Sequence, residues 1–124
     1  MTYDEARRLV IFESCVEQAD SEGLIVLVRC TGEPGAERVI ALLNALKAVF
    51  EWHVGKDVIE RKPANALHIL AQEIINQTEG PRRTKSEFYK WERWDIASAA
   101  EGVLQGEWPD EWLSYGKRRN PDDS

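Results

Sequence analysis

Two histidines and two cysteines are the residues of this chain best suited to zinc binding or nucleophilic catalysis. His53 and His68 lie fifteen positions apart, and Cys15 and Cys30 also stand alone. Zinc sites instead use closely spaced ligand pairs, such as two cysteines two positions apart. We therefore expect histidines in the core or at its rim and reduced cysteines that act as small hydrophobic residues. No glycine-rich nucleotide motif occurs either, so we expect no cofactor.

Four acidic residues form two pairs with the same spacing, Glu17 with Asp20 and Glu92 with Asp95. Residues three apart on a helix share a face. Two such faces could hold Mg²⁺ through carboxylate oxygens, as in helical phosphohydrolases. In a chain with 22 acidic residues such spacings also arise by chance, and paired charges are usually a solvated helix face. A metal-dependent phosphohydrolase is therefore an alternative function.

A basic cluster precedes an aromatic segment. Arg82, Arg83 and Lys85 are followed by Phe88, Tyr89, Trp91 and Trp94. Basic residues interleaved with aromatic ones are typical of proteins that bind single-stranded nucleic acid. The net charge of −6 argues against nucleic acid and against an anionic membrane as partners. A nucleic-acid-associated factor is therefore only a second alternative.

Tryptophans and carboxylates gather near the end of the chain. Four of the five tryptophans lie between positions 91 and 112, and acidic residues stand among the later ones. Aromatic side chains placed among charges are typical of recognition surfaces. The competing interpretation is that the indoles pack a last short helix against the rest of the domain. We expect a partner-binding face formed by Trp91, Trp94, Glu107, Trp108, Asp110, Glu111 and Trp112.

Length and composition indicate one globular domain. The chain has 124 residues, of which 43% are hydrophobic and 31% charged, which suffices for a single core. We expect a helical domain over 1–116 and a solvated tail over 117–124. The start, MTYDEARRLV, lacks the features of a signal peptide, and the longest apolar run, 24–28, is too short to span a bilayer. These features predict a soluble, cytoplasmic protein.

Helical periodicity dominates the first half of the chain. Thr2 is a favourable N-cap, and apolar residues recur at helical spacing from Leu9 and Phe12 through positions 16, 19, 23, 26 and 30. This series predicts helix from about residue 3 to residue 30, either continuous or broken at Gly23. The β-branched run over 24–30 leaves a short strand as the alternative.

Glycine and proline divide the rest into further helices. Pro34 should open a helix that ends before Gly55, and Pro63 another that stops at Gly80-Pro81. Thr84 and Glu87 match a capping box. The helix that follows should run to Gln105, with Tyr89, Ile96, Ala100, Val103 and Leu104 facing inward, before a short last helix over 109–116.

Together these patterns predict an all-α fold, a small bundle of four to five helices with short Gly/Pro connections; an α+β fold with a strand at 24–30 is the alternative. For function we expect a small acidic non-enzymatic protein-binding module, such as an inhibitor, an adaptor or an immunity-type protein. Its partner would be a protein, and an acidic chain suits one with a basic surface. A homodimer is also compatible with the apolar run at 24–28.

Overall fold

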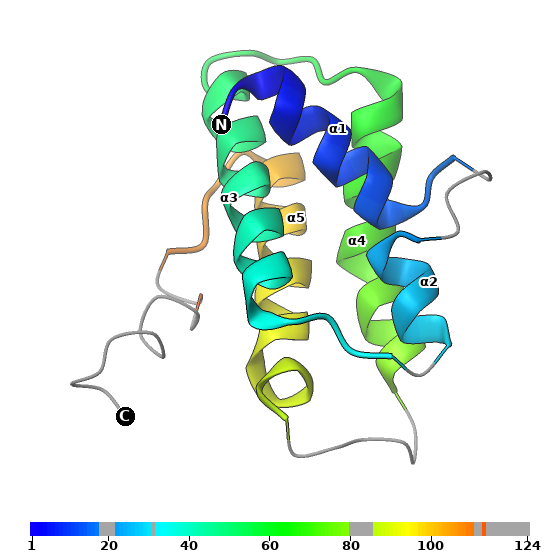
Figure 1. The fold of residues 1–124 in the computed structure, drawn as a ribbon. Coiled ribbons are helices and arrows are strands. Elements are labelled where there is room, and N and C mark those ends of the chain that lie inside the picture. Colours follow the sequence, from blue (N-terminus) through cyan, green and yellow to red (C-terminus); the bar gives the residue numbers. More distant parts are fainter. Residues whose placement is uncertain (18–21, 31, 80–85, 111–112, 114–124) are drawn as a thin grey trace.

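The computed structural model describes residues 1–17, 22–30, 32–79, 86–110 and 113, and within them every regular element is helical. Figure 1 shows the longer helices packed side by side. In chain order the elements are α1 (Tyr3–Ser14), α2 (Leu24–Arg29), α3 (Ala36–His53), α4 (Arg61–Thr78), the π-helix η1 (Phe88–Glu92) and α5 (Arg93–Gln105). The all-α prediction is confirmed. No helix of these ranges is long and apolar enough to cross a bilayer.

Helix α1 begins as predicted and ends earlier than predicted. The Thr2 hydroxyl accepts a hydrogen bond from the Glu5 amide at 3.2 Å. The helix ends at Ser14, because Cys15 takes a left-handed conformation with φ of 58°, which the helical backbone cannot continue. The break therefore falls well before Gly23.

The buried face of α1 also differs from the predicted one. Leu9 and Phe12 are only half-buried. The fully buried positions of this helix are Ala6, Val10, Ile11, Glu13 and Ser14. The face is rotated because it must meet two helices, α3 and α4. As a result a carboxylate, that of Glu13, is directed into the core.

The segment Leu24–Arg29 is helical, so the alternative of a strand over 24–30 is wrong. The described residues contain no other strand with which it could pair, and a lone strand leaves its backbone groups unsatisfied. Gly23 occupies the N-cap of α2, so a new helix begins directly after it. Leu24, Ile25 and Val28 are buried, so most of this apolar run belongs to the core.

Helices α3 and α4 are the two longest. α3 begins at Ala36, two residues after the predicted Pro34, and ends before Gly55, whose φ of 79° is the predicted left-handed stop. α4 begins at Arg61, two residues before Pro63, which is tolerated in the first turn because its missing amide has no intrahelical partner there. α4 ends at Thr78; the predicted stop at 80–81 lies outside the described residues.

The last described helices, η1 and α5, are continuous. The Ser86 hydroxyl accepts from the Tyr89 amide at 3.4 Å and caps the first described turn, whereas the predicted cap Thr84 lies outside the described residues. α5 ends at the predicted Gly106, with φ of 80°. Leu104, predicted to face inward, is 36% exposed, because it stands in the last turn beside an open cavity.

The chain after Gly106 only partly tests the predicted last helix. Pro109, Asp110 and Leu113 are not helical, and the remainder of 109–116 and the tail over 117–124 lie outside the described residues. Leu113 is buried and donates its amide to the Pro109 carbonyl at 3.1 Å. This segment therefore returns to the core.

Helix α5 packs against both α3 and α4. Three alanines, Ala97, Ala99 and Ala100, are buried on it, and small side chains let neighbouring helices approach closely. Most faces of α5 are covered in this way. The exposed strip that remains begins with Trp91 of η1 and Trp94.

One buried carboxylate joins three helices at the other side of the bundle. The Arg38 guanidinium of α3 donates two hydrogen bonds to the Glu13 carboxylate of α1. They are 2.7 Å long to Oε2 and 2.6 Å long to Oε1. Its Oε1 also accepts the Leu24 amide of α2 at 3.1 Å. Arg38 also donates a hydrogen bond to the Glu22 backbone carbonyl at 2.8 Å. We call this group of contacts the Glu13 junction.

Removal of the charge at this junction should destabilise the fold. The Glu13 side chain is 2% exposed and that of Arg38 is 33% exposed, so Glu13→Gln leaves a guanidinium that water solvates only in part. We expect a loss of about 2–3 kcal/mol in the free energy of unfolding, below the usual cost for a fully buried pair. Urea unfolding followed by circular dichroism measures it.

The matched control is Glu17→Gln. Glu17 forms an ion pair with Lys62 at 2.7 Å, but both side chains are about half exposed to solvent, so its removal should leave the midpoint of unfolding unchanged. Equal midpoints for the Glu13 and Glu17 variants would contradict the role assigned to the junction.

A second prediction concerns the close approach of Gly23 to α1. A Cβ at Gly23 would lie 2.3 Å from the Phe12 carbonyl oxygen and 2.4 Å from the Cys15 sulfur. Gly35 occupies the same N-cap position on α3, with nearly the same dihedral angles and nothing within 4 Å. Gly23→Ala should therefore lower the free energy of unfolding by about 1–3 kcal/mol more than Gly35→Ala, as measured in urea. Equal losses of stability in the two variants would show that Gly23 does not pack this closely against the end of α1.

Candidate functional site

The described tryptophans of the predicted binding face divide into two kinds. Trp91 and Trp94 are 48% and 47% exposed. Trp108 is partly buried, packs on the core, and lies with its ring centroid 5.7 Å from that of Phe50. Trp112 lies outside the described residues. One described indole of this face thus packs on the core, and two are about half exposed.

The indole of Trp94 rests on a fixed cation. Arg93 is buried, and its guanidinium carbon lies 5.2 Å from the Trp94 ring centroid. Arg93 donates to the Tyr89 carbonyl at 2.8 Å and to the Thr78 hydroxyl at 3.0 Å, and lies 3.7 Å from a Glu79 carboxylate oxygen. These contacts tie the start of α5 to the end of α4. A cation–π contact with an immobile arginine restricts the indole before any partner arrives.

A π-helical turn lies directly before this indole. In η1 the Arg93 amide reaches back to the Phe88 carbonyl, a span of five residues. Wide turns of this kind are unusual and occur often at functional sites. Here the turn carries Trp91 and joins it to α5, which carries Trp94.

Acidic residues lie further along the same strip. Glu101 and Glu107 line one surface depression of about 320 Å³ together with Ser98, Gln105 and Trp108. Glu101 accepts from the Gln105 amide group at 3.0 Å. Asp110 is exposed, and Glu111 lies outside the described residues. The structure thus brings the predicted residues Glu107 and Trp108 together with Glu101, which the prediction did not include. We call Trp91, Trp94, Ser98, Glu101, Gln105 and Glu107 the α5 strip.

The residues of the metal alternative are not assembled into a site. Glu17 bonds Lys62 at 2.7 Å, which lowers the pKa of the Glu17 carboxyl through that hydrogen bond. Glu92 and Asp95 are buried, and Asp20 lies outside the described residues. Across the described ranges no three His, Cys, Asp or Glu side chains form a group that could hold a metal ion.

The remaining candidates are accounted for individually. His53 donates from Nδ1 to the Val49 carbonyl at 2.7 Å, and His68 is exposed. Cys15 and Cys30 are free thiols. The basic cluster of the nucleic-acid alternative, Arg82, Arg83 and Lys85, lies outside the described residues.

The sequence did not predict an aromatic cluster at the opposite end of the bundle. The rings of Tyr3 and Trp52 stack with their centroids 4.6 Å apart, and the Lys56 ammonium lies 4.4 Å from the Trp52 ring centroid. Arg7 bonds Glu60 at 3.2 and 3.1 Å, which lowers the pKa of the Glu60 carboxyl. Burial is the main cause that raises the pKa of the Tyr3 hydroxyl. The contacts of Tyr3 with Trp52 and of Arg7 with Glu60 join residues about fifty positions apart, which no local pattern reveals.

Comparison of this chain with protein families, curated proteins and solved structures found no match. The function proposed below is therefore inferred from the geometry of this structure alone.

The acidic part of the strip should depend on Gly102. A Cβ there would lie 2.4 Å from the Glu107 carbonyl oxygen and 2.8 Å from Pro109 Cδ. In an isolated helix Gly→Ala gains about 1 kcal/mol. In this protein we expect Gly102→Ala to lose stability and to shift the amide resonances of 107–110 in a ¹⁵N-correlated NMR spectrum. A stabilised variant with unmoved resonances would contradict the packing described.

Proposed function

We propose that this chain is a small acidic, non-enzymatic protein-binding module of the inhibitor, adaptor or immunity type, and that the α5 strip is its binding face. The single observation that carries the proposal is the exposure of Trp91 and Trp94. A domain with a well-filled core leaves two neighbouring indoles about half in water, although indoles contribute more than most side chains to burial and to binding.

The contact of Trp94 with Arg93 favours a role in partner binding over chance exposure. Trp94 lies on the Arg93 guanidinium, which is held by the hydrogen bonds that it donates to the Tyr89 carbonyl and the Thr78 hydroxyl. An anchor that is already restricted loses less conformational entropy on binding than a mobile one. Binding hot spots are enriched in tryptophan for the same combination of large contact area and low flexibility.

The charge of the strip indicates the kind of partner. Between positions 95 and 110 the sequence contains no lysine or arginine, while Glu101, Glu107 and Asp110 are exposed. Glu101 follows Trp94 by seven residues, which is about 10 Å along a helix. A complementary partner therefore offers an apolar pocket for the indoles with basic residues about 10 Å away.

The proposal is tested by comparing three immobilised proteins: the wild type, Trp94→Ala and Trp52→Ala. Trp52 is the matched control, since it is 50% exposed but lies at the other end of the bundle. Quantitative mass spectrometry of a native extract should find a basic protein retained by the wild type and by Trp52→Ala. With the purified partner, Trp94→Ala should weaken binding about 30-fold, as expected for a hot spot worth about 2 kcal/mol.

Two further measurements separate the strip from a general loss of structure. Circular dichroism should show unchanged helicity in Trp94→Ala. Glu101→Lys together with Glu107→Lys should weaken binding, and added salt should do the same to the wild type. A partner bound equally by the wild type and Trp94→Ala, but lost with Trp52→Ala, would refute the assignment of this face.

A further inference from the structure

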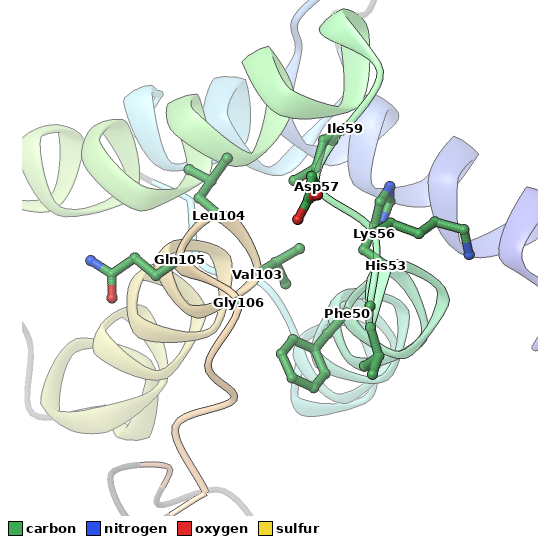
Figure 2. Close-up of a pocket in the computed structure, with 11 residues that line it drawn as sticks. Phe50, His53, Lys56, Asp57, Ile59, Val103, Leu104, Gln105 and Gly106 are labelled. Atoms are coloured by element: carbon green, nitrogen blue, oxygen red, sulfur yellow. The ribbon is translucent and has the colours of Figure 1, made fainter.

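A cavity of the described structure lies between the C-terminal ends of two helices and borders the α5 strip at Gln105. It has a volume of about 420 Å³ and is lined by the last turn of α5, Val103 to Gly106, by Phe50 and His53 of α3, and by the connection over 54–59. Figure 2 shows the carboxylate of Asp57 pointing into the space between Leu104, Val103 and Phe50, while Lys56 extends away from it.

The backbone makes this cavity electronegative. The last carbonyls of a helix have no intrahelical partner, and the helix dipole places partial negative charge at this end. α5, of 13 residues, ends at the cavity, and its last turn holds no basic residue. α3 also ends there, but its Glu51, Trp52 and His53 carbonyls already accept from the Val54 amide, the Lys56 ammonium and the Lys56 amide, so the negative end is that of α5. A cation is the ordinary complement to such an end.

The side chains add charge of the same sign. Within the described residues the Asp57 carboxylate has no hydrogen bond and no ion pair. The one lysine that lines the cavity, Lys56, directs its ammonium to the Trp52 carbonyl and over the Trp52 ring. His53 donates from Nδ1 to Val49, which leaves Nε2 as an acceptor when the ring is neutral.

The apolar walls of the cavity favour an organic cation over a metal ion. Phe50, Ile59, Val103 and Leu104 supply apolar surface, which a hydrated ion cannot use but an alkyl stem can. The cavity thus combines an apolar wall with a single carboxylate beside two helix C-termini.

We propose that this cavity binds a primary alkylammonium group on a short aliphatic stem. The ammonium lies between Asp57 and the carbonyl end of α5, and the stem lies against Phe50, Val103 and Leu104. The chemistry is shared by a free small amine and by the lysine side chain of a protein. The site borders the α5 strip at Gln105 and does not depend on the function proposed for that strip.

The test is an NMR titration of the full chain with n-butylammonium, followed by ¹⁵N-correlated spectra. The expected result is saturable shifts at the amides of 53–57 and 103–106. Affinity should rise about fourfold per methylene from ethyl- to butylammonium, because each buried methylene contributes a similar transfer free energy. n-Butanol, which lacks the charge, should bind at least tenfold more weakly.

Four variants make the test specific. Asp57→Asn should weaken butylammonium binding about tenfold or more, whereas Glu37→Gln, which removes the same charge at the far end of α3, should not. Leu104→Ala should flatten the dependence on stem length, because it removes part of the wall. Trp94→Ala should bind like the wild type, so that failure of this proposal and failure of the α5 strip can be told apart.

A second arm identifies the source of the amine. A short peptide containing one lysine is compared with free butylammonium and with the same peptide acetylated on that lysine. Tighter binding of the unmodified peptide assigns the site to a protein lysine, and equal or weaker binding assigns it to a free amine. The proposal is overturned if neither amine shifts these resonances at millimolar concentration, or if Asp57→Asn binds as the wild type does.

Discussion

The Glu13 junction is the interaction on which the arrangement of the helices depends. A carboxylate with only 2% of its side chain exposed is stable only if its charge is matched and its oxygens accept hydrogen bonds. Arg38 supplies the charge in a two-pronged contact and the Leu24 amide supplies a further donor. Because each donor comes from a different helix, the positions of α2 and α3 are fixed relative to α1 at one point.

Local signals in the sequence predicted the ends of several helices well. Thr2, Gly55 and Gly106 act where they were expected, because capping depends on the residue at one position and its immediate neighbours. The buried face of α1 was predicted less well. Apolar residues occur both at Leu9 and Phe12 and at Val10 and Ile11, so periodicity alone permits two faces, and the contact with α3 decides between them.

The candidate sites could be predicted only in part for the same reason. The sequence indicated that tryptophans and acidic residues gather late in the chain, but it could not separate the packed Trp108 from the exposed Trp94. That distinction depends on Phe50, from a distant helix, and on the return of the chain over Gly102. The cavity beside Asp57 could not be predicted, because it exists only where the ends of α3 and α5 meet. The start of the α5 strip thus carries two exposed indoles, whereas its end borders the cavity beside Asp57.

A double-mutant cycle on Glu13 and Arg38 tests the central claim most directly. The free energies of unfolding of Glu13→Gln, Arg38→Met and the double variant are compared with that of the wild type. If the junction fixes the helices, the two single losses do not add, and the coupling energy is about 2 kcal/mol, within the range of strongly coupled pairs. A coupling energy below about 0.5 kcal/mol, the usual limit for independent sites, would contradict the account.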